Sequence, residues 1–201
     1  MKLKQWRARL ARFFWRRRFA HFGERTIIYA PMMITNPGWM RIGDDTCIRD
    51  GARLEVVHSP GATWTPQLSI GSRVNIEQGV HIVCQGRVTI EDGVSITPYC
   101  AIVDTYHPFD PPDQGIKIGD RLPDRETHVR VGAGSFIGTH SVILPNVTIG
   151  KGCVIGAGSV VSTDLPDYSV AAGAPARVIK QFDVATRAWH SVAASSPCTT
   201  P

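Results

Sequence analysis

The feature of this 201-residue sequence that most constrains its fold is a six-residue period. Val, Ile or Leu occupies the first position of each hexad, Gly is frequent at the second, and the fifth residue is often small or β-branched. So regular a pattern indicates one repeated structural unit rather than a mixed fold. The repeat supplies fifteen hexads in five blocks of eighteen residues: 42–59, 70–87, 90–107, 131–148 and 149–166.

An α-helix requires apolar residues at i, i+3, i+4 and i+7, and a half-buried strand requires alternation, so a period of six fits neither. It fits short strands joined by tight corners, with the first residue of each hexad pointing inward. Three hexads then form one triangular turn, and successive turns stack like the strands of a parallel sheet, about 4.8 Å apart. The sequence therefore predicts an all-β chain, a parallel β-helix of about five coils and roughly 24 Å in length.

The net charge of +5 is concentrated at the N-terminus. Residues 1–25 hold nine Lys or Arg and one Glu, a balance of +8 that leaves −3 for the remaining residues. A slightly acidic body argues against a nucleic-acid-binding protein. The five cysteines form no CxxC pair, which argues against a zinc site or a disulfide framework. We find no signal peptide and no apolar run of about 18 residues, and we expect a cytoplasmic protein.

Residues 1–26 are expected to form a basic amphipathic helix. Arg side chains lie opposite an apolar stripe made of Leu3, Trp6, Leu10, Phe13 and Phe14. Such a helix suits peripheral contact of residues 1–22 with an anionic membrane surface, for example the inner face of the cell membrane. The same stripe also suits a cap over the first coil, because the end of a solenoid must be covered. Both interpretations stay open.

The repeat breaks twice, at residues 60–69 and, for longer, at residues 108–130. Long loops inside compact domains often serve as lids or binding loops. His107 is the last residue before the longer break, which contains five acidic residues. A lone His is more often structural than catalytic. However, a His held between a rigid coil and a loop has the fixed aim that a general base needs, and its ordinary pKa lies near working pH.

Two stretches resemble the hexapeptide-repeat acyltransferases: "IEDGVSITPYCAIVDTYHP" (90–108) and "VGAGSFIGTHSVILPNVTIGKGCVIGAGSVVSTDLPDYSVAAGAPARVIK" (131–180). The similarity is to the galactoside, maltose and nodulation-factor O-acetyltransferases and to the polysaccharide-biosynthesis acetyltransferases. The closing "VAAGAPARVIK" is its most diagnostic part. The resemblance implies a left-handed parallel β-helix domain over residues 27–180. The tail at 181–201 is small and polar, and we expect it to fray.

The resemblance also implies a reaction, the transfer of an acetyl group from acetyl-CoA to a sugar hydroxyl. Carried across, the catalytic general base falls on His107. Asp104, three residues earlier, either orients the imidazole or is a common corner residue. Where the family has an acceptor-binding Asn, this chain has Glu77, with Asn75 two residues before it. Both Asn75 and Glu77 are candidate acceptor ligands.

In the family that this chain resembles, acetyl-CoA lies in the groove between two subunits of a homotrimer. The matching positions supply small residues for the pantetheine arm and two cations for the CoA phosphates. They are Phe136, Thr139, Ala157, Ser162, Thr163, Arg177 and Lys180. No metal is required. The γ-class carbonic anhydrases share this solenoid, but the H-x4-H spacing of their metal ligands does not occur here.

The sequence thus favours an acetyl-CoA-dependent sugar O-acetyltransferase of bacterial surface polysaccharide synthesis. Two alternatives stay open. One is an N-acyltransferase that acts on an amino-sugar nucleotide, which would use the same coil and a similar His. The other is a non-catalytic β-helix scaffold held at a membrane by the N-terminal helix. Acetyl transfer that depends on His107 separates the enzymes from the scaffold.

Overall fold

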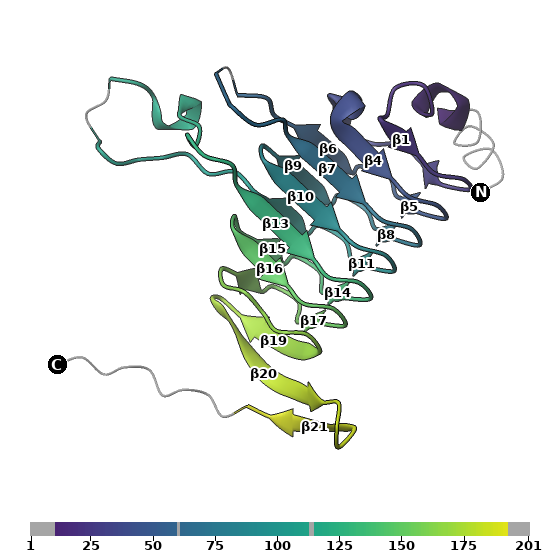
Figure 1. Cartoon of the computed structure of the whole chain (residues 1–201), viewed down its shortest axis with the longest axis vertical. Coiled ribbons are helices and arrows are strands. Elements are labelled where there is room, and N and C mark those ends of the chain that lie inside the picture. Colours follow the sequence, from purple (N-terminus) through teal and green to yellow (C-terminus); the bar gives the residue numbers. More distant parts are fainter. Residues whose placement is uncertain (1–10, 60, 113–114, 193–201) are drawn as a thin grey trace.

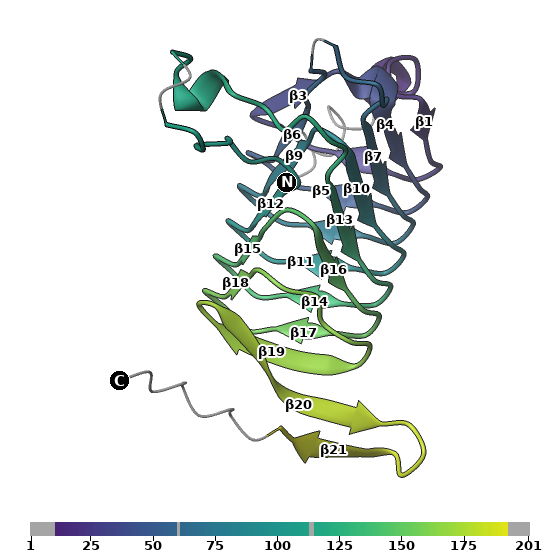
Figure 2. The same ribbon diagram turned by 60° about the vertical axis from the view of Figure 1, so that its left-hand side comes forward.

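The computed structural model describes residues 11–59, 61–112 and 115–192, and these residues wind into a three-sided solenoid (Figures 1 and 2). Each side is a mostly parallel sheet, and the chain visits the three sides in turn, so every strand pairs with the strand one coil away. The predicted all-β, left-handed parallel β-helix is confirmed. Two short 3-10 helices, η1 (Pro37–Trp39) and η2 (Ile118–Asp120), interrupt it.

We name the three sides sheets A, B and C in the order in which the chain visits them. Sheet A contains β1 (His21–Phe22), β4 (Met40–Ile42), β7 (Gln67–Ile70), β10 (Arg87–Ile90), β13 (His128–Val131) and β16 (Val147–Ile149). Sheet B contains β2 (Ile27–Ile28), β5 (Cys47–Ile48), β8 (Asn75–Ile76), β11 (Ser95–Ile96), β14 (Phe136–Ile137), β17 (Val154–Ile155), β19 (Ser169–Gly173), β20 (Ala176–Asp183) and β21 (Ala188–Ser191). Sheet C contains β3 (Met33–Thr35), β6 (Arg53–Val56), β9 (His81–Cys84), β12 (Ala101–Val103), β15 (Val142–Ile143) and β18 (Val160–Val161).

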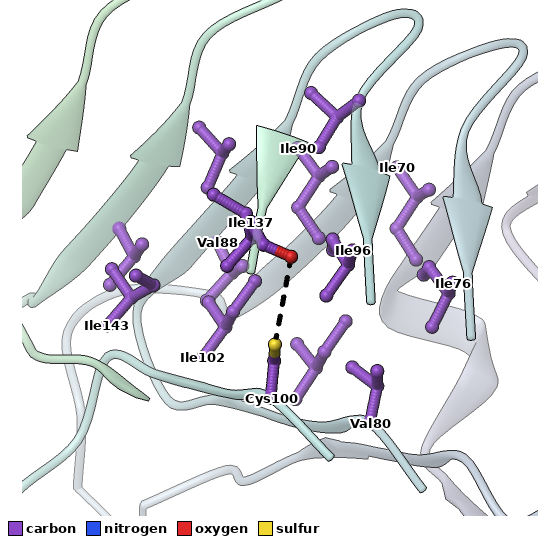
Figure 3. Packing of buried hydrophobic residues seen from close by; sticks show 14 of the residues in the cluster. Ile70, Ile76, Val80, Val88, Ile90, Ile96, Cys100, Ile102, Ile137 and Ile143 are labelled. Carbon is purple, nitrogen blue, oxygen red and sulfur yellow. Dashed lines mark hydrogen bonds between the residues drawn. The ribbon is translucent and has the colours of Figure 1, made fainter. Parts of the chain in front are cut away.

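The first residue of every predicted hexad points into the solenoid and is buried. Figure 3 shows how these aliphatic side chains form continuous stacks along the axis, as Ile76, Ile96 and Ile137 do. In-register pairing aligns the stacks, because Ile96 pairs with Ile76 on one side and with Ile137 on the other. The core is therefore a column of aliphatic rows, and each coil is stabilised by burial against its two neighbours.

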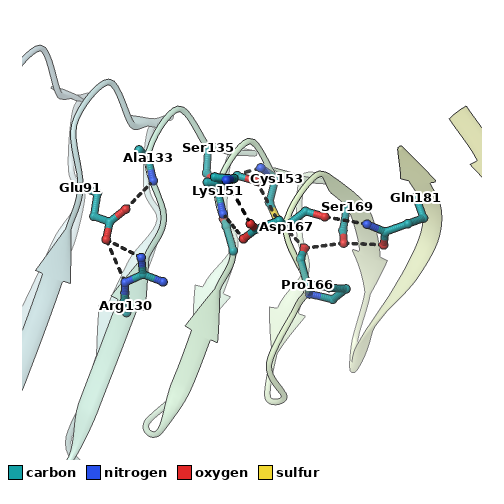
Figure 4. Close-up of polar contacts among 11 residues, drawn as sticks. Glu91, Arg130, Ala133, Ser135, Lys151, Cys153, Pro166, Asp167, Ser169 and Gln181 are labelled. Carbon is teal, nitrogen blue, oxygen red and sulfur yellow. Dashed lines mark hydrogen bonds and ion pairs between the residues drawn. The ribbon is translucent and has the colours of Figure 1, made fainter. Parts of the chain in front are cut away.

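Small polar residues at the fifth position of the hexads satisfy backbone groups at the corners. The Cys100 thiol donates to the carbonyl oxygen of Gly138 at 3.1 Å, and Cys153 donates to that of Pro166 at 3.2 Å. Ser135 makes an equivalent bond to the Gly150 carbonyl at 2.9 Å (Figure 4). Both cysteines are buried and fill the core at their corners.

Where glycine occupies the second hexad position, neighbouring coils can approach closely, as they do at Gly132. A Cβ added to Gly132 would lie 2.5 Å from the carbonyl carbon of Gly150 and 2.5 Å from the Lys151 nitrogen. Both contacts are with backbone, which cannot move away without separating the coils.

The solenoid has one coil more than the hexads indicated. Phe22, Ile28 and Ile34 occupy the first hexad positions of a coil that precedes residue 42, and its strands pair with the next coil. Phe22 and Ile28 are buried, whereas Ile34 packs against the core from a partly buried position. The hexad count missed this coil because it opens on an aromatic residue rather than an aliphatic one.

Residues 11–15 are helical, and the segment that follows closes the first coil. Phe19 is buried, and its ring lies 5.7 Å from that of Trp15 and 5.4 Å from that of Phe22. Phe13 and Phe14 are exposed, so they do not contribute to this cap. The predicted stripe residues Leu3, Trp6 and Leu10 lie outside the described residues. The capping interpretation thus holds for the described part, but through aromatic residues other than those of the stripe.

The chain after Lys180 departs from the frayed tail expected from sequence. β20 and β21 form an antiparallel hairpin at the end of sheet B, through residue 191. The ring of Phe182 lies 6.3 Å from Tyr168 and 5.3 Å from Trp189. Aromatic packing therefore orders a segment whose composition looked too polar to fold. The last part of the predicted tail, residues 193–201, lies outside the described residues. No helix in the described chain has the length and apolar character needed to cross a membrane.

Both breaks in the repeat leave the solenoid at the corner between sheet C and sheet A. The first spans residues 57–66, between β6 and β7, and the second spans residues 104–127, between β12 and β13. Figure 1 shows them as the two extensions beside the coils. The long loop is shorter at its end than the predicted 108–130, because 128–130 pair with β10 as part of β13.

Candidate active site

His107 lies where the chain leaves sheet C for the long loop, four residues after the end of β12. Its side chain is exposed, and Nδ1 lies 2.9 Å from the carbonyl oxygen of Arg121 in the same loop. A carbonyl oxygen can only accept, so Nδ1 carries the hydrogen of the neutral imidazole. Nε2 therefore keeps its lone pair. This is the tautomer that a general base needs, and it is set by the loop.

Arg121 organises the long loop from within. Its side chain is 7% exposed, and the guanidinium donates to three loop carbonyl oxygens. These are Ile116 (2.9 Å), Pro111 (3.0 Å) and Pro112 (3.4 Å). A planar guanidinium has several donors in a fixed geometry, so one side chain can bind three backbone carbonyls at once. Because the Arg121 carbonyl also binds His107, the shape of the loop determines the orientation of the imidazole.

Asp104 is fully buried at the base of the same loop. Its two carboxylate oxygens accept from the backbone N–H groups of Gln85 (2.6 Å) and Gly86 (2.9 Å). Burial raises the pKa of this carboxyl group to about 6, against the opposing effect of the backbone hydrogen bonds. Asp104 thus contacts the neighbouring coil, while the contact that orients the imidazole comes from Arg121. An orienting role for Asp104 stays a prediction, and the observed bonds favour its alternative as a corner residue.

Gln85 connects the two loops. It is fully buried, its side-chain nitrogen donates to the Ser59 hydroxyl (3.2 Å) and to the Pro123 carbonyl (3.4 Å), and its own carbonyl accepts from the Trp64 indole (3.0 Å). Thr127 donates to its side-chain oxygen at 3.4 Å. Gln85 therefore supports both loops, residues 57–66 and 104–127, and fixes their position relative to the coil.

The two candidate acceptor ligands lie at another corner. Asn75 begins β8 in sheet B and is exposed. Glu77 follows β8 at the corner between sheets B and C, and its carboxylate lies 3.7 Å from the Arg49 guanidinium. A strand of sheet C separates this corner from the one that bears His107. A single chain therefore does not bring Asn75 or Glu77 to His107.

The predicted donor-site residues fall into two groups. Phe136 and Lys180 lie in one row across sheet B, because Phe136 pairs with Val154, Val154 with Val170 and Val170 with Lys180. Arg177 is on the same outer strand, and Thr139 and Ala157 occupy the corners between sheets B and C. Ser162 and Thr163 instead follow β18, at the corner between sheets C and A. They share their corner with His107.

Sequence reasoning missed Arg121 and Gln85. Neither belongs to a recognisable motif, and each acts through backbone carbonyls that a sequence cannot place in space. The one available signal for Gln85 is its position, as a long polar residue in place of the aliphatic or small residues that surround it in "HIVCQGRV". Among the described residues no cluster of His, Cys, Asp and Glu has the arrangement of a metal site.

The family model described as bacterial transferase hexapeptide (six repeats) matches residues 128–163. The chain is 38% identical to the galactoside O-acetyltransferase of Escherichia coli, over 57% of this chain and 57% of that one. It is 29% identical to WbbJ of Escherichia coli, named for O-acetyl transfer in lipopolysaccharide biosynthesis, over 82% and 83%. A protein of Mycobacterium tuberculosis named as a probable acetyltransferase is 32% identical over 78% of this chain and 46% of its own length. The chain thus spans about half the length of the first and last of these relatives.

Solved structures share the fold. AntD, an N-acyltransferase from Bacillus cereus in complex with dTDP and 3-hydroxybutyryl-CoA, superposes with a TM-score of 0.68 at 22% identity, over 84% of this chain and 86% of that one. A maltose O-acetyltransferase from Clostridium difficile superposes with a TM-score of 0.54 at 24% identity, over 85% and 74%. With its repeat and its solenoid, the chain is a left-handed β-helix protein that carries a bacterial transferase hexapeptide repeat at residues 128–163 and is similar to hexapeptide-repeat acetyltransferases.

Proposed function

We propose that the protein is an acetyl-CoA-dependent O-acetyltransferase that acts on a sugar hydroxyl in bacterial surface polysaccharide synthesis, with His107 as general base. The observation that carries the proposal is the bond between Nδ1 of His107 and the Arg121 carbonyl, which leaves Nε2 free to accept a proton. The galactoside O-acetyltransferase and WbbJ support an oxygen acceptor by their names and their similarity.

In the proposed reaction, Nε2 of His107 removes the proton of the sugar hydroxyl as its oxygen attacks the thioester carbonyl carbon. The C–O bond forms, and the carbonyl electrons move to oxygen as a tetrahedral oxyanion. Its collapse breaks the C–S bond, and the leaving thiolate of CoA takes the proton from the imidazolium. The acetyl ester, free CoA and neutral His107 result. General-base assistance of this kind typically contributes about 10²–10⁴-fold in rate.

The row from Phe136 to Lys180 is the proposed track of the donor. Phe136 is 44% exposed and offers an apolar surface to the pantetheine arm, while Arg177 and Lys180 are exposed cations on the same sheet. Paired cations suit the phosphates of CoA. Small corner residues such as Thr139 and Ala157 leave space for the arm to follow the edge of the solenoid. Ser162 and Thr163 would face the donor from the corner of His107.

A homotrimer would complete this site. The separation of Glu77 and His107 within one chain means that they can meet only across two copies. The outer face of sheet C carries an apolar row, in which Ala101 pairs with Val142 and Val142 with Val160. Such a row suits burial against another copy of the chain. The trimer, with sites between subunits, is therefore part of the proposal.

The location is proposed on chemical grounds. Acetyl-CoA is a cytoplasmic donor, and a surface-polysaccharide acceptor is assembled at the inner face of the cell membrane. The exposed Phe13 and Phe14 lie beside Arg17 and Arg18, whose guanidinium groups stack on their rings at 4.1 and 4.6 Å. Aromatic and basic side chains together suit an anionic membrane surface. We therefore propose peripheral membrane contact through residues 1–22 in addition to the cap.

Two other functions compete. AntD has the same fold and transfers to nitrogen, which keeps an amino-sugar nucleotide as an alternative acceptor. A non-catalytic scaffold is the other alternative. The test is the release of free CoA from acetyl-CoA by the full chain and by His107→Ala, with hydroxyl sugars, amino-sugar nucleotides and polysaccharides as acceptors.

Release that requires a hydroxyl acceptor and is lost in His107→Ala, with the melting temperature unchanged, is the expected result. Release with amine acceptors alone would establish the N-acyltransferase instead. No release with any acceptor, combined with no binding of acetyl-CoA by calorimetry, would leave the scaffold. His190→Ala is the matched control, because His190 is also exposed but lies on β21, away from both loops.

A further inference from the structure

The outer face of sheet A is hollowed along the solenoid axis. A cavity of about 480 Å³ lies at the edge of the sheet where β4, β7 and β10 begin, beside the two loops. Hollows of about 570 and 340 Å³ continue from it along the sheet. Neighbouring hollows have lining residues in common, so they form one groove. The 480 Å³ cavity shares Arg87 and Glu126 with the 340 Å³ hollow and Arg41 with the 570 Å³ hollow, and the last two share Thr89. We call this the sheet A groove.

The floor of the groove is a ladder of outward-facing polar side chains. Ser69 pairs in register with Thr89, Thr89 with Arg130 and Arg130 with Thr148. Gln67, Arg87 and His128 form a second row beside the first. The ladder repeats at the strand spacing of about 4.8 Å and stands on a rigid sheet. A long, preorganised and regularly repeating polar surface matches an extended repeating polymer better than a compact ligand.

Two tryptophans form the end of the groove. Trp39 and Trp64 both line the 480 Å³ cavity, together with Arg41, Gln67, Arg87 and Glu126. The Trp64 indole is held by the Gln85 carbonyl, and the Trp39 ring packs at 5.2 Å on the ring of His58. Both rings are only half-buried, which leaves indole surface accessible. A fixed aromatic surface beside polar side chains suits a ligand with an apolar ring face and hydroxyl edges.

The charges in the groove are balanced rather than uniformly basic. Arg87 bonds Glu126 at 3.1 Å, and Arg130 bonds Glu91 at 2.5 Å (Figure 4). A polyanion such as a nucleic acid is bound through an excess of positive charge. Paired donors and acceptors instead match hydroxyl groups, which both donate and accept. The ligand class that this groove favours is therefore a hydroxyl-rich, largely uncharged chain.

The groove also reaches the two loops that leave the solenoid at the corner of His107. Glu126 belongs to the last part of the long loop, and Trp64 belongs to the shorter loop; Gln85 supports both. We propose that the sheet A groove binds an extended glycan of several pyranose residues, with a sugar ring stacked on the tryptophan pair. The link to acetyl transfer rests on the proposed function. If both hold, the acceptor is an oligosaccharide rather than a single sugar.

Binding is measured without turnover, by isothermal titration of the full chain in the absence of acetyl-CoA. The probes are malto-, cello- and galacto-oligosaccharides of one to eight residues, with a heparin octasaccharide and a single-stranded DNA 20-mer as polyanions. In at least one neutral series we expect the affinity to rise with chain length up to several residues. We expect Trp39→Ala to weaken that binding about tenfold, the upper range for loss of one aromatic contact.

The matched control is Trp189→Ala, which removes a half-exposed tryptophan from the distant β21. It should bind as the wild type does. Gln67→Ala provides a second variant that changes the groove floor without removing a ring. An affinity that does not depend on chain length or on Trp39, tighter binding of either polyanion, or no binding to any neutral series would overturn the inference.

Failure of the inference and failure of the proposed function give different results. Acetylation of a monosaccharide, with no binding of longer chains and no effect of Trp39→Ala, would retain the enzyme and remove the groove. Binding of oligosaccharides that is lost in Trp39→Ala, with no release of CoA on any acceptor, would retain the groove and remove the enzyme.

Discussion

Asp104→Asn tests the buried polar network beneath the long loop through its dependence on pH. In an unfolded chain this carboxyl loses its proton near pH 3.8, whereas in the folded chain burial raises its pKa to about 6. Each pKa unit corresponds to about 1.4 kcal/mol, so a difference of roughly two units is worth about 3 kcal/mol. Asp104 is fully buried, so screening by solvent does not reduce this figure much.

The sign follows from proton binding. Between pH 3.8 and 6 the folded chain binds more protons than the unfolded chain, so the free energy of unfolding falls as the pH rises. The contribution is complete below about pH 3.8 and is lost above about pH 6. Asn cannot ionise. The stability of Asp104→Asn relative to wild type should therefore improve by about 3 kcal/mol between pH 4 and pH 7.

The amide of Asn presents a donor where Asp104 now accepts two backbone N–H groups, and this costs about 1–3 kcal/mol at every pH. The pH trend is therefore the diagnostic quantity. It is measured by urea unfolding, followed by tryptophan fluorescence, from pH 4 to 7.5 at one protein concentration. Asp124→Asn, at an exposed position of the same loop, controls for the loss of one charge. A difference between variant and wild type that stays flat with pH would refute the reasoning.

Three further perturbations test the same corner. Gly86→Ala places a Cβ 2.2 Å from a backbone carbonyl oxygen of the long loop, so we expect faster limited proteolysis of that loop and lower acetyl transfer. Gly119→Ala should leave both unchanged, because its Cβ would meet only the flexible Lys117 side chain at 3.8 Å. In Arg121→Lys a single nitrogen replaces the three guanidinium nitrogens that each bond a different carbonyl, and we expect kcat to fall about 10²-fold through misplacement of His107, with KM for acetyl-CoA retained. Burial raises the pKa of Cys84 well above its usual range, so iodoacetamide at pH 8 should modify it only after unfolding, as followed by mass spectrometry of peptides.

The sequence predicted the regular part of the fold because its physical cause is local and repeated. Each hexad places an aliphatic residue such as Ile102 at the inward position, and stacking then requires the same position in the next coil. The pattern fails where aromatic residues, rather than aliphatic ones, fill the inward position or order the segment. Phe22 opens a coil that an aliphatic template does not detect, and the aromatic contact of Phe182 orders a hairpin in a segment that reads as polar.

The candidate site was predictable only in part. His107 was found because it stands at a break in the repeat, and breaks locate loops. Its hydrogen-bond partner was not found, because Arg121 binds through its backbone carbonyl, and a carbonyl is present at every residue. The same limit applies to Asp104, whose contacts are backbone N–H groups of a neighbouring coil. Contacts between coils depend on register, which a single sequence specifies only where the aliphatic pattern continues.

At the corner between sheets C and A, a β-helix can insert functional loops and still keep its buried core intact. Strands must keep their pairing with both neighbouring coils, so added residues can leave only at corners. Both insertions of this chain use the same corner, and Gln85 lies between them with its amide, its carbonyl and its side chain all engaged. The indole of Trp64, on which we propose that the acceptor rests, and the loop that orients His107 therefore share one rigid support. The orientation of the imidazole and the shape of the proposed acceptor surface thus both depend on Gln85. This dependence accounts for a buried polar residue in a strand that is otherwise apolar.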